Sequence, residues 1–183
     1  MKVYLAGPEV FLPDAIDVGR HKADLCARYG LSGSYPLDNV IDPTAADASL
    51  QIFRANQAMM NEADAIIANL TPFRGPSADA GTVYELGYMA AGGKLCLGYS
   101  NDPTLYADRV ARFTAVKPRG DRLTDAEGLT VENFRFPDNL MIIHALDLYG
   151  CPLIVPLTAP SDIWHDLTWF EACVKLAATR LAS

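Results

Sequence analysis

The sequence predicts one α/β domain built on a parallel sheet with helices on both faces. Apolar runs of strand length alternate with longer segments of helical periodicity along the 183 residues. Residues 63–70 (ADAIIANL) are mostly apolar, which is typical of a strand buried on both faces. The chain is long enough for one hydrophobic core and short for two, so we expect residues 1–183 to form a single domain.

Five short segments are predicted as strands, at residues 3–5, 34–37, 63–70, 94–99 and 153–157. The first is apolar and ends at the turn signal Gly7-Pro8. In a parallel sheet, ligands bind outside the carboxyl ends of the strands. We therefore expect the loops at residues 6–11, 38–42 and 69–79 to line a pocket.

Five longer segments are predicted as helices, at residues 15–29, 49–62, 81–92, 139–146 and 160–181. Apolar residues recur at helical spacing in the first two, and Gly30 and Gly92 follow the first and third as stop signals. Pro160 opens the last helix. Residues 100–137 are predicted to be loop-rich and irregular.

The charge balance excludes several classes of partner. Acidic residues outnumber basic ones by 22 to 15, which gives a formal net charge of −7. An acidic surface repels phosphate groups, so we expect neither nucleic acid nor an anionic membrane as a partner. No apolar stretch approaches the ~20 residues of a membrane span, and the amino terminus lacks signal-peptide architecture. We expect a cytoplasmic protein.

Cysteines and histidines are few and widely spaced, at Cys26, Cys96, Cys151, Cys173, His21, His144 and His165. No CxxC pair or dense disulfide framework is present. The pattern favours reduced, buried thiols and predicts no metal site.

Two carboxylates, Asp79 and Glu85, stand six residues apart across a predicted loop-to-helix junction. On one helix they would face different directions, so they pair only if Asp79 lies in the loop and Glu85 in the first helical turn. Such a pair suits glycosyl transfer, in which one carboxylate attacks the anomeric carbon and a second acid protonates the leaving group. However, the stretch from Thr82 to Glu85 also fits the S/T-x-x-E capping box, and the pattern alone favours a helix cap over a catalyst.

Other residues in the expected pocket loops are weaker candidates. Tyr4 lies in a buried strand, where most tyrosines are core residues. Gly7 belongs to a turn without the spacing of a phosphate-binding loop. Phe11 can stack on a planar ligand, although packing is the commoner role. Asp38 is a usual turn residue, and Asn139 is most simply the start of a helix.

Five blocks of sequence resemble the nucleoside 2-deoxyribosyltransferase family. They are VYLAGPEVF at residues 3–11, PLDN at 36–39, ADAIIANL at 63–70, PFRG with DAGTVYELG across 72–87, and PDNLM at 137–141. No single block is decisive, but their order and spacing are specific. The resemblance reverses the preference for Glu85 as a helix cap.

The resemblance implies a flavodoxin-like sheet and a two-step displacement with net retention. Glu85 falls where the family has its nucleophile, which attacks C1′ of a 2′-deoxynucleoside and holds the sugar as an ester. Asp79 matches a carboxylate beside the sugar, for positioning hydroxyls or transferring a proton. Tyr4 matches a tyrosine that orients the nucleophile. The implied substrates are 2′-deoxynucleosides and free nucleobases, the implied role is base salvage, and no cofactor is needed.

The resemblance also implies substrate-binding residues. Gly7 and Asp38 lie in pocket loops, and Phe11 would help to pack the base. Asn56 stands where some members have an Asp that transfers a proton to the base; an amide can bind a base edge but cannot be a general acid. Asn139 and Met141 match a segment that members lend to a neighbouring subunit, which implies a homo-oligomer.

Two alternatives remain open. A 2′-deoxynucleoside 5′-phosphate N-glycosidase must hold a phosphate, and Glu9 in the first loop opposes that charge, which favours a free nucleoside. A nucleoside-binding module without turnover is also compatible with every motif.

Overall fold

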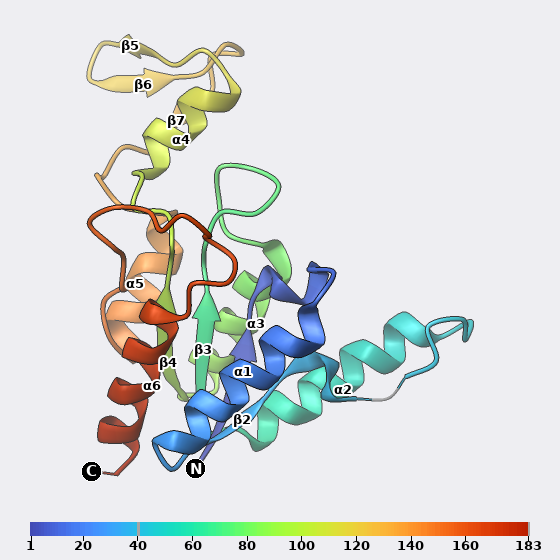
Figure 1. Ribbon diagram of the computed structural model, residues 1–183. Helices are drawn as coiled ribbons and strands as arrows, with labels where there is room; N and C mark the ends of the chain where they lie inside the picture. The colour runs from blue at the N-terminus through green and yellow to red at the C-terminus, as the bar shows by residue number, and fades with distance from the viewer. Residues whose placement is uncertain (40, 183) are drawn as a thin grey trace.

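The computed structural model describes residues 1–39 and 41–182, and its centre is a parallel sheet of four strands. The strand order is β2 (Ser32–Ser34), β1 (Lys2–Ala6), β3 (Ala65–Asn69) and β4 (Leu95–Tyr99). Every neighbouring pair is parallel, so the carboxyl ends of the strands meet at one edge (Figure 1). The predicted α/β class and parallel sheet are confirmed.

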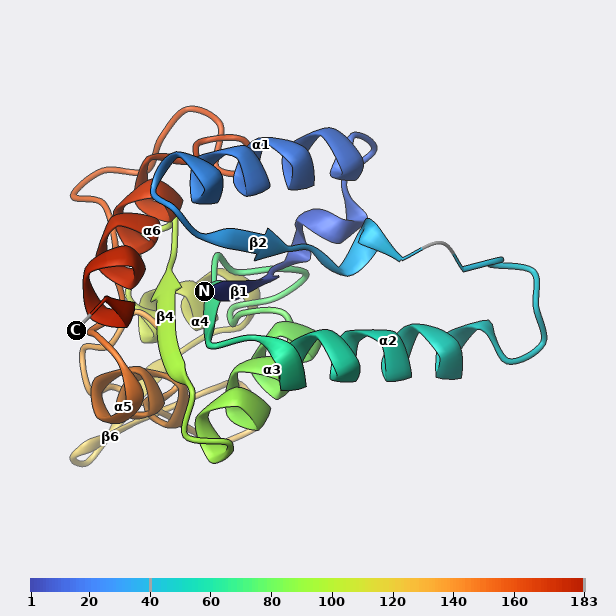
Figure 2. The ribbon, with the colours of Figure 1, turned by 90° about the horizontal axis from the view of Figure 1, so that it is seen from below.

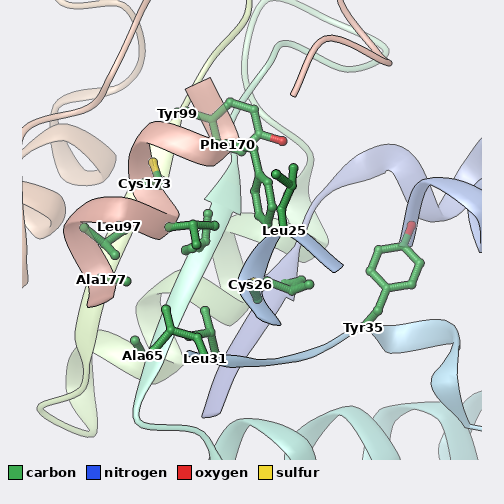
Figure 3. Packing of buried hydrophobic residues seen from close by; sticks show 14 of the residues in the cluster. Leu25, Cys26, Leu31, Tyr35, Ala65, Leu97, Tyr99, Phe170, Cys173 and Ala177 are labelled. Carbon is green, nitrogen blue, oxygen red and sulfur yellow. The ribbon is translucent and has the colours of Figure 1, made fainter. Parts of the chain in front are cut away.

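Helices cover both faces of this sheet, because alternate side chains of each strand point to opposite sides. Val3 and Leu5 of β1 pack in the core under α1 (Ala15–Arg28) and α6 (Thr168–Leu181). Figure 3 shows this core, with Leu25 and Phe170 from the two helices. Tyr4 and Ala6 belong to the opposite core, under α2 (Ala48–Glu62), α3 (Ala80–Ala91) and α5 (Leu140–Tyr149). Figure 2 shows the sheet between the two helical layers.

The prediction of a fifth strand at residues 153–157 is wrong. The segment of residues 150–154 lies beside β4 but pairs with it, in the described structure, only at two isolated bridges, Cys96 with Gly150 and Tyr99 with Ile154. Ile154 donates its N–H to the Gly98 carbonyl at 3.0 Å, whereas Pro152 has no N–H to extend the ladder. Gly150 is required where the chains meet, because a Cβ there would lie 1.6 Å from the Cys96 oxygen. The segment occupies the fifth position without forming a regular strand.

The region of residues 100–137 is more regular than predicted. It contains helix α4 (Tyr106–Phe113) and a small antiparallel sheet of β5 (Lys117–Arg119), β6 (Arg122–Thr124) and β7 (Thr130–Val131). This lobe projects from the main body in Figure 1. Its strands are too short to show a clear period-2 pattern, which explains why the sequence did not reveal them.

Two other element boundaries differ from the prediction. Helix α6 begins at Thr168 rather than near residue 160. Asp162 accepts hydrogen bonds from the backbone of Trp164 and His165, and this local turn competes with a helix. The second strand ends at Ser34, and a 3₁₀ turn, η2 (Pro36–Asp38), takes the expected strand position.

All four cysteines are buried and free, in agreement with the prediction. None of the helices in the described part of the chain is long and apolar enough to cross a membrane. Across residues 1–39 and 41–182, no group of three or more His, Cys, Asp or Glu side chains is placed to hold a metal ion.

Candidate active site

A cavity of about 460 Å³ opens at the carboxyl ends of β1, β2 and β3. This volume suits a small organic ligand, for which pockets measure roughly 300–1,000 Å³. Its polar lining includes Asn39, Asn56, Asp79, Thr82 and Glu85. The rest of the wall is formed by glycines and apolar residues, at Gly7, Val10, Phe11, Pro36, Leu37, Ile41, Pro43, Ile52 and Gly81. The predicted pocket loops therefore meet around one cavity.

Glu85 reaches the cavity wall from α3 and is held from behind by β1. The hydroxyl of Tyr4 donates a hydrogen bond to Glu85 Oε1 at 2.6 Å. Burial raises the pKa of Glu85 to about 7, the Tyr4 hydrogen bond opposes this rise, and the charge of Asp79 adds to it. Tyr4 is fully buried, and burial together with the Glu85 charge keeps its pKa well above the ordinary value. Tyr4 is thus a neutral donor that orients and partly stabilises an ionised Glu85.

Asp79 is the N-cap of α3 and lines the same cavity. Its Oδ2 accepts from the backbone N–H of Thr82 at 2.9 Å and from Thr82 Oγ1 at 3.1 Å. The prediction that Asp79 lies in the loop before the helix is confirmed. The first-turn position predicted for Glu85 is wrong, because α3 already begins at Ala80 and Glu85 falls in its second turn. The capping-box interpretation is also wrong, since Asp79 is the cap and the Glu85 carboxylate bonds to Tyr4.

Three of the predicted binding residues line the cavity and three do not. Gly7, Phe11 and Asn56 are in its wall, and the Oδ1 atom of Asn56 is buried without a hydrogen-bond partner in the described structure. Asp38 instead points to solvent and accepts from the Tyr35 backbone at 2.7 Å, while its neighbour Asn39 faces the cavity.

The other two residues lie at the start of α5, outside this cavity. Asn139 is the N-cap of α5, and its Oδ1 accepts from the backbone of Met141 at 2.9 Å. Met141 is 72% exposed. Most of the Met141 side chain is therefore accessible to another molecule.

A buried charge network behind the cavity was not foreseen. Glu9 is fully buried and accepts hydrogen bonds from Lys22, from Asn69 at 2.7 Å and from Tyr99 at 3.0 Å. The idea that Glu9 repels a phosphate is therefore wrong, because its charge is paired with Lys22 and does not line the cavity. Lys22 lies on the buried side of α1, where a lysine in an apolar stripe is a signal the sequence offered.

This network also determines the shape of the first loop. A Cβ at Gly7 would lie 2.0 Å from Glu9 Oε2, so only glycine fits between the Glu9 carboxylate and the cavity. The bonds from Glu9 to Asn69 and Tyr99 join the loop after β1 to the ends of β3 and β4. The loop that carries Phe11 is thus anchored to the sheet.

Comparisons with known proteins bear on the family and the fold. The family model described as nucleoside 2-deoxyribosyltransferase matches residues 3–141. An uncharacterized protein of Schizosaccharomyces pombe is 36% identical over 197 residues, which cover 99% of this chain and 90% of that protein. A structure of 2-desoxiribosyltransferase from Leishmania mexicana is similar with a TM-score of 0.60 and 36% identity, over 77% of this chain and 84% of that one. A conserved protein from Enterococcus faecalis V583 shares the fold, with a TM-score of 0.58 and 20% identity over 96% and 97% of the two chains.

Proposed function

The chain belongs to the nucleoside 2-deoxyribosyltransferase family, and from this premise we propose that it transfers a 2-deoxyribosyl group between nucleobases, with Glu85 as the nucleophile. The observation that carries the proposal is the Glu85 carboxylate in the cavity wall, held by Tyr4 at 2.6 Å with Asp79 nearby. A carboxylate that only stabilised a helix would not need a buried tyrosine from a distant strand.

In the proposed first step, a carboxylate oxygen of Glu85 attacks C1′ of the bound deoxynucleoside. The C1′–N bond breaks, its electron pair leaves with the base, and the base takes a proton from Asp79 or from solvent. In the second step a nitrogen of another base attacks C1′, the ester bond breaks and its electron pair returns to Glu85. The incoming base gives up the proton of that nitrogen to Asp79 or to solvent. Two inversions give net retention.

The residue types suit this chemistry. The transition state resembles an oxocarbenium ion, and the negative charge of Glu85 stabilises it. The ionised form of Glu85 is the nucleophile, so its pKa of about 7 makes the reaction sensitive to pH near neutrality. The Tyr4 hydrogen bond favours that ionised form.

The remaining cavity residues provide for the base and the sugar. We assign the Asn56 amide to a base edge, because its Oδ1 is buried without a hydrogen-bond partner in the described structure and an amide offers both a donor and an acceptor. Phe11 is assigned to packing the base, and Gly7 to the close approach of the backbone. Because Asp38 is exposed and its neighbour Asn39 lines the cavity, we assign the binding of a sugar hydroxyl to Asn39.

We also propose that the molecule is a homo-oligomer. The start of α5, with half-buried Asn139 and the 72% exposed Met141, is the segment proposed to complete a neighbouring subunit's pocket. Limited water access then favours transfer over hydrolysis of the ester.

A base-exchange assay tests the proposal. Incubation with thymidine and adenine should produce deoxyadenosine and thymine. Glu85→Gln should abolish exchange and still bind nucleoside, and a slow deoxynucleoside analogue should yield a sugar ester on Glu85 that mass spectrometry detects. Glu62→Gln, at an exposed glutamate paired with Lys2, is the matched control and should retain full activity.

The same assay distinguishes the alternatives. Thymine and free deoxyribose without deoxyadenosine indicate a hydrolase, which is then compared on thymidine and its 5′-phosphate. Binding without any turnover indicates a binding module. Undiminished exchange in Glu85→Gln rules out the proposed nucleophile.

A further inference from the structure

The loop between β3 and α3 is held by a buried pair of charged side chains from two distant segments of the chain. Arg109 of α4 and Asp138, just before α5, are each 2% exposed. Arg109 Nη2 lies 3.3 Å from Asp138 Oδ2. Neither residue lines the cavity with Glu85. A buried ion pair outside the proposed catalytic machinery calls for a specific role.

The pair contacts three consecutive residues of the loop. Arg109 Nε donates to the Pro76 carbonyl at 2.6 Å. Ser77 Oγ donates to Asp138 Oδ1, and the backbone N–H of Ala78 donates to Asp138 Oδ2 at 3.0 Å. The residue that follows is Asp79, the cap of α3. The backbone is therefore fixed up to the residue whose carboxylate faces the cavity.

Arginine and aspartate are specifically suited to this task. The Arg109 guanidinium also donates to the Thr104 carbonyl at 2.5 Å and to the Pro137 carbonyl, so its planar fork binds acceptors in several directions at once. Asp138 additionally accepts from the Asn139 backbone at 2.7 Å. Lysine or asparagine at these positions cannot satisfy the same set of partners.

The contacts of the pair are made to loops and helix ends. Apart from the bond between them, Arg109 and Asp138 form these hydrogen bonds with residues 76–78, with the segment just before α4 and with the segment just before α5. The main sheet and its two hydrophobic cores are formed by other residues. What the pair fixes is the path of the chain into α3.

We propose that Arg109 and Asp138 are positioning residues that hold Asp79 in its place at the reacting sugar. The kinetic consequence of this inference rests on the proposed function. The contacts of Arg109 and Asp138 with residues 76–78, called the clamp below, do not depend on that function. Displacement of a group by about 1 Å can cost about 100-fold in rate. Asp138→Asn should therefore lower kcat by about 10- to 100-fold, while KM for the nucleoside changes far less.

The test is a double-mutant cycle with Asp79. If Asp138 acts through Asp79, Asp138→Asn has little further effect on kcat in an Asp79→Ala background. Arg109→Lys should behave like Asp138→Asn. Arg112→Lys is the matched control, because Arg112 is on the same helix but is 61% exposed at its side chain and should leave kcat unchanged. Ser77→Ala removes one contact without leaving a buried charge, and replaces Asp138→Asn in the cycle if that variant does not fold.

Amide hydrogen exchange provides a readout that needs no activity. The Ala78 N–H bonds to Asp138, so its exchange should accelerate at least about tenfold in Asp138→Asn and remain unchanged in Arg112→Lys. The inference is overturned if Asp138→Asn lowers kcat equally in the parent and in Asp79→Ala, or if it leaves the exchange rate of the Ala78 amide unchanged. A parent protein without turnover of deoxynucleosides overturns the proposed function instead, and the Ala78 amide then decides on the clamp alone.

Discussion

Tyr4→Phe removes the hydroxyl that donates to Glu85 and leaves the aromatic ring in the core. A hydrogen bond to a charged group contributes about 1.5–3 kcal/mol. Because one pKa unit corresponds to about 1.36 kcal/mol, the loss should raise the pKa of Glu85 from about 7 by about one to two units. At pH 7 the ionised share then falls from about one half to between about one tenth and one hundredth, and the exchange rate falls about 5- to 50-fold.

The assay is kcat/KM for base exchange between about pH 5.5 and 9.5, which reports the ionisation of the free enzyme. The acidic limb of the profile should move to higher pH in Tyr4→Phe, and most of the lost rate should return at the alkaline end. Tyr88→Phe is the matched control, because Tyr88 is on the same helix as Glu85 but donates to Asn61 at 2.7 Å. An unshifted acidic limb in Tyr4→Phe, or a loss equally large at every pH, would refute the reasoning.

Three further outcomes follow from the same contacts. The pKa of Glu85 in the folded protein, about 7, lies above its ordinary value of 4.5. The stability that the protonated Glu85 gives the folded protein is therefore fully present below pH 4.5 and is lost as the pH rises through 7. Glu85→Gln should therefore raise the free energy of unfolding at about pH 8 by about 2–3 kcal/mol, and urea denaturation should show no gain below pH 4.5. Asp79→Asn keeps a good helix cap for the Thr82 N–H, so the free energy of unfolding measured by thermal denaturation should change by less than about 0.5 kcal/mol. The rate of base exchange should nevertheless fall at least about tenfold. Lys22→Met leaves the buried Glu9 unpaired and should cost about 3–5 kcal/mol in denaturant unfolding, much of which returns when Glu9→Gln is added.

The candidate site could be predicted in its parts but not in its assembly. Asp79 and Glu85 were found from their spacing, because both lie within one short stretch. The helix start between them was misplaced, since Asp79 and Thr82 are both good caps and local pattern does not choose between them. The structure has Asp79 as the cap, directly after a loop held by Arg109 and Asp138.

Long-range polar contacts left the weakest trace in the sequence. Glu9 looked like a charge facing the ligand, and only its partners Lys22, Asn69 and Tyr99 show that it is internal. Similarly, Asp38 looked like a pocket residue, but the η2 turn directs it to solvent and Asn39 to the cavity. A turn of a few residues decides such orientations, and its geometry depends on what it packs against.

The sequence alone determined the alternation of strands and helices, the burial of residues 65–69 and the presence of two carboxylates at one loop-to-helix junction. These features depend on neighbours along the chain, which hydrophobic periodicity and turn residues encode directly. Only the tertiary structure decided that Tyr4 meets Glu85, that Glu9 pairs with Lys22 and that Asp138 holds the loop before Asp79. Each of those contacts joins separate elements, and its geometry is fixed only when the sheet and its helices have packed.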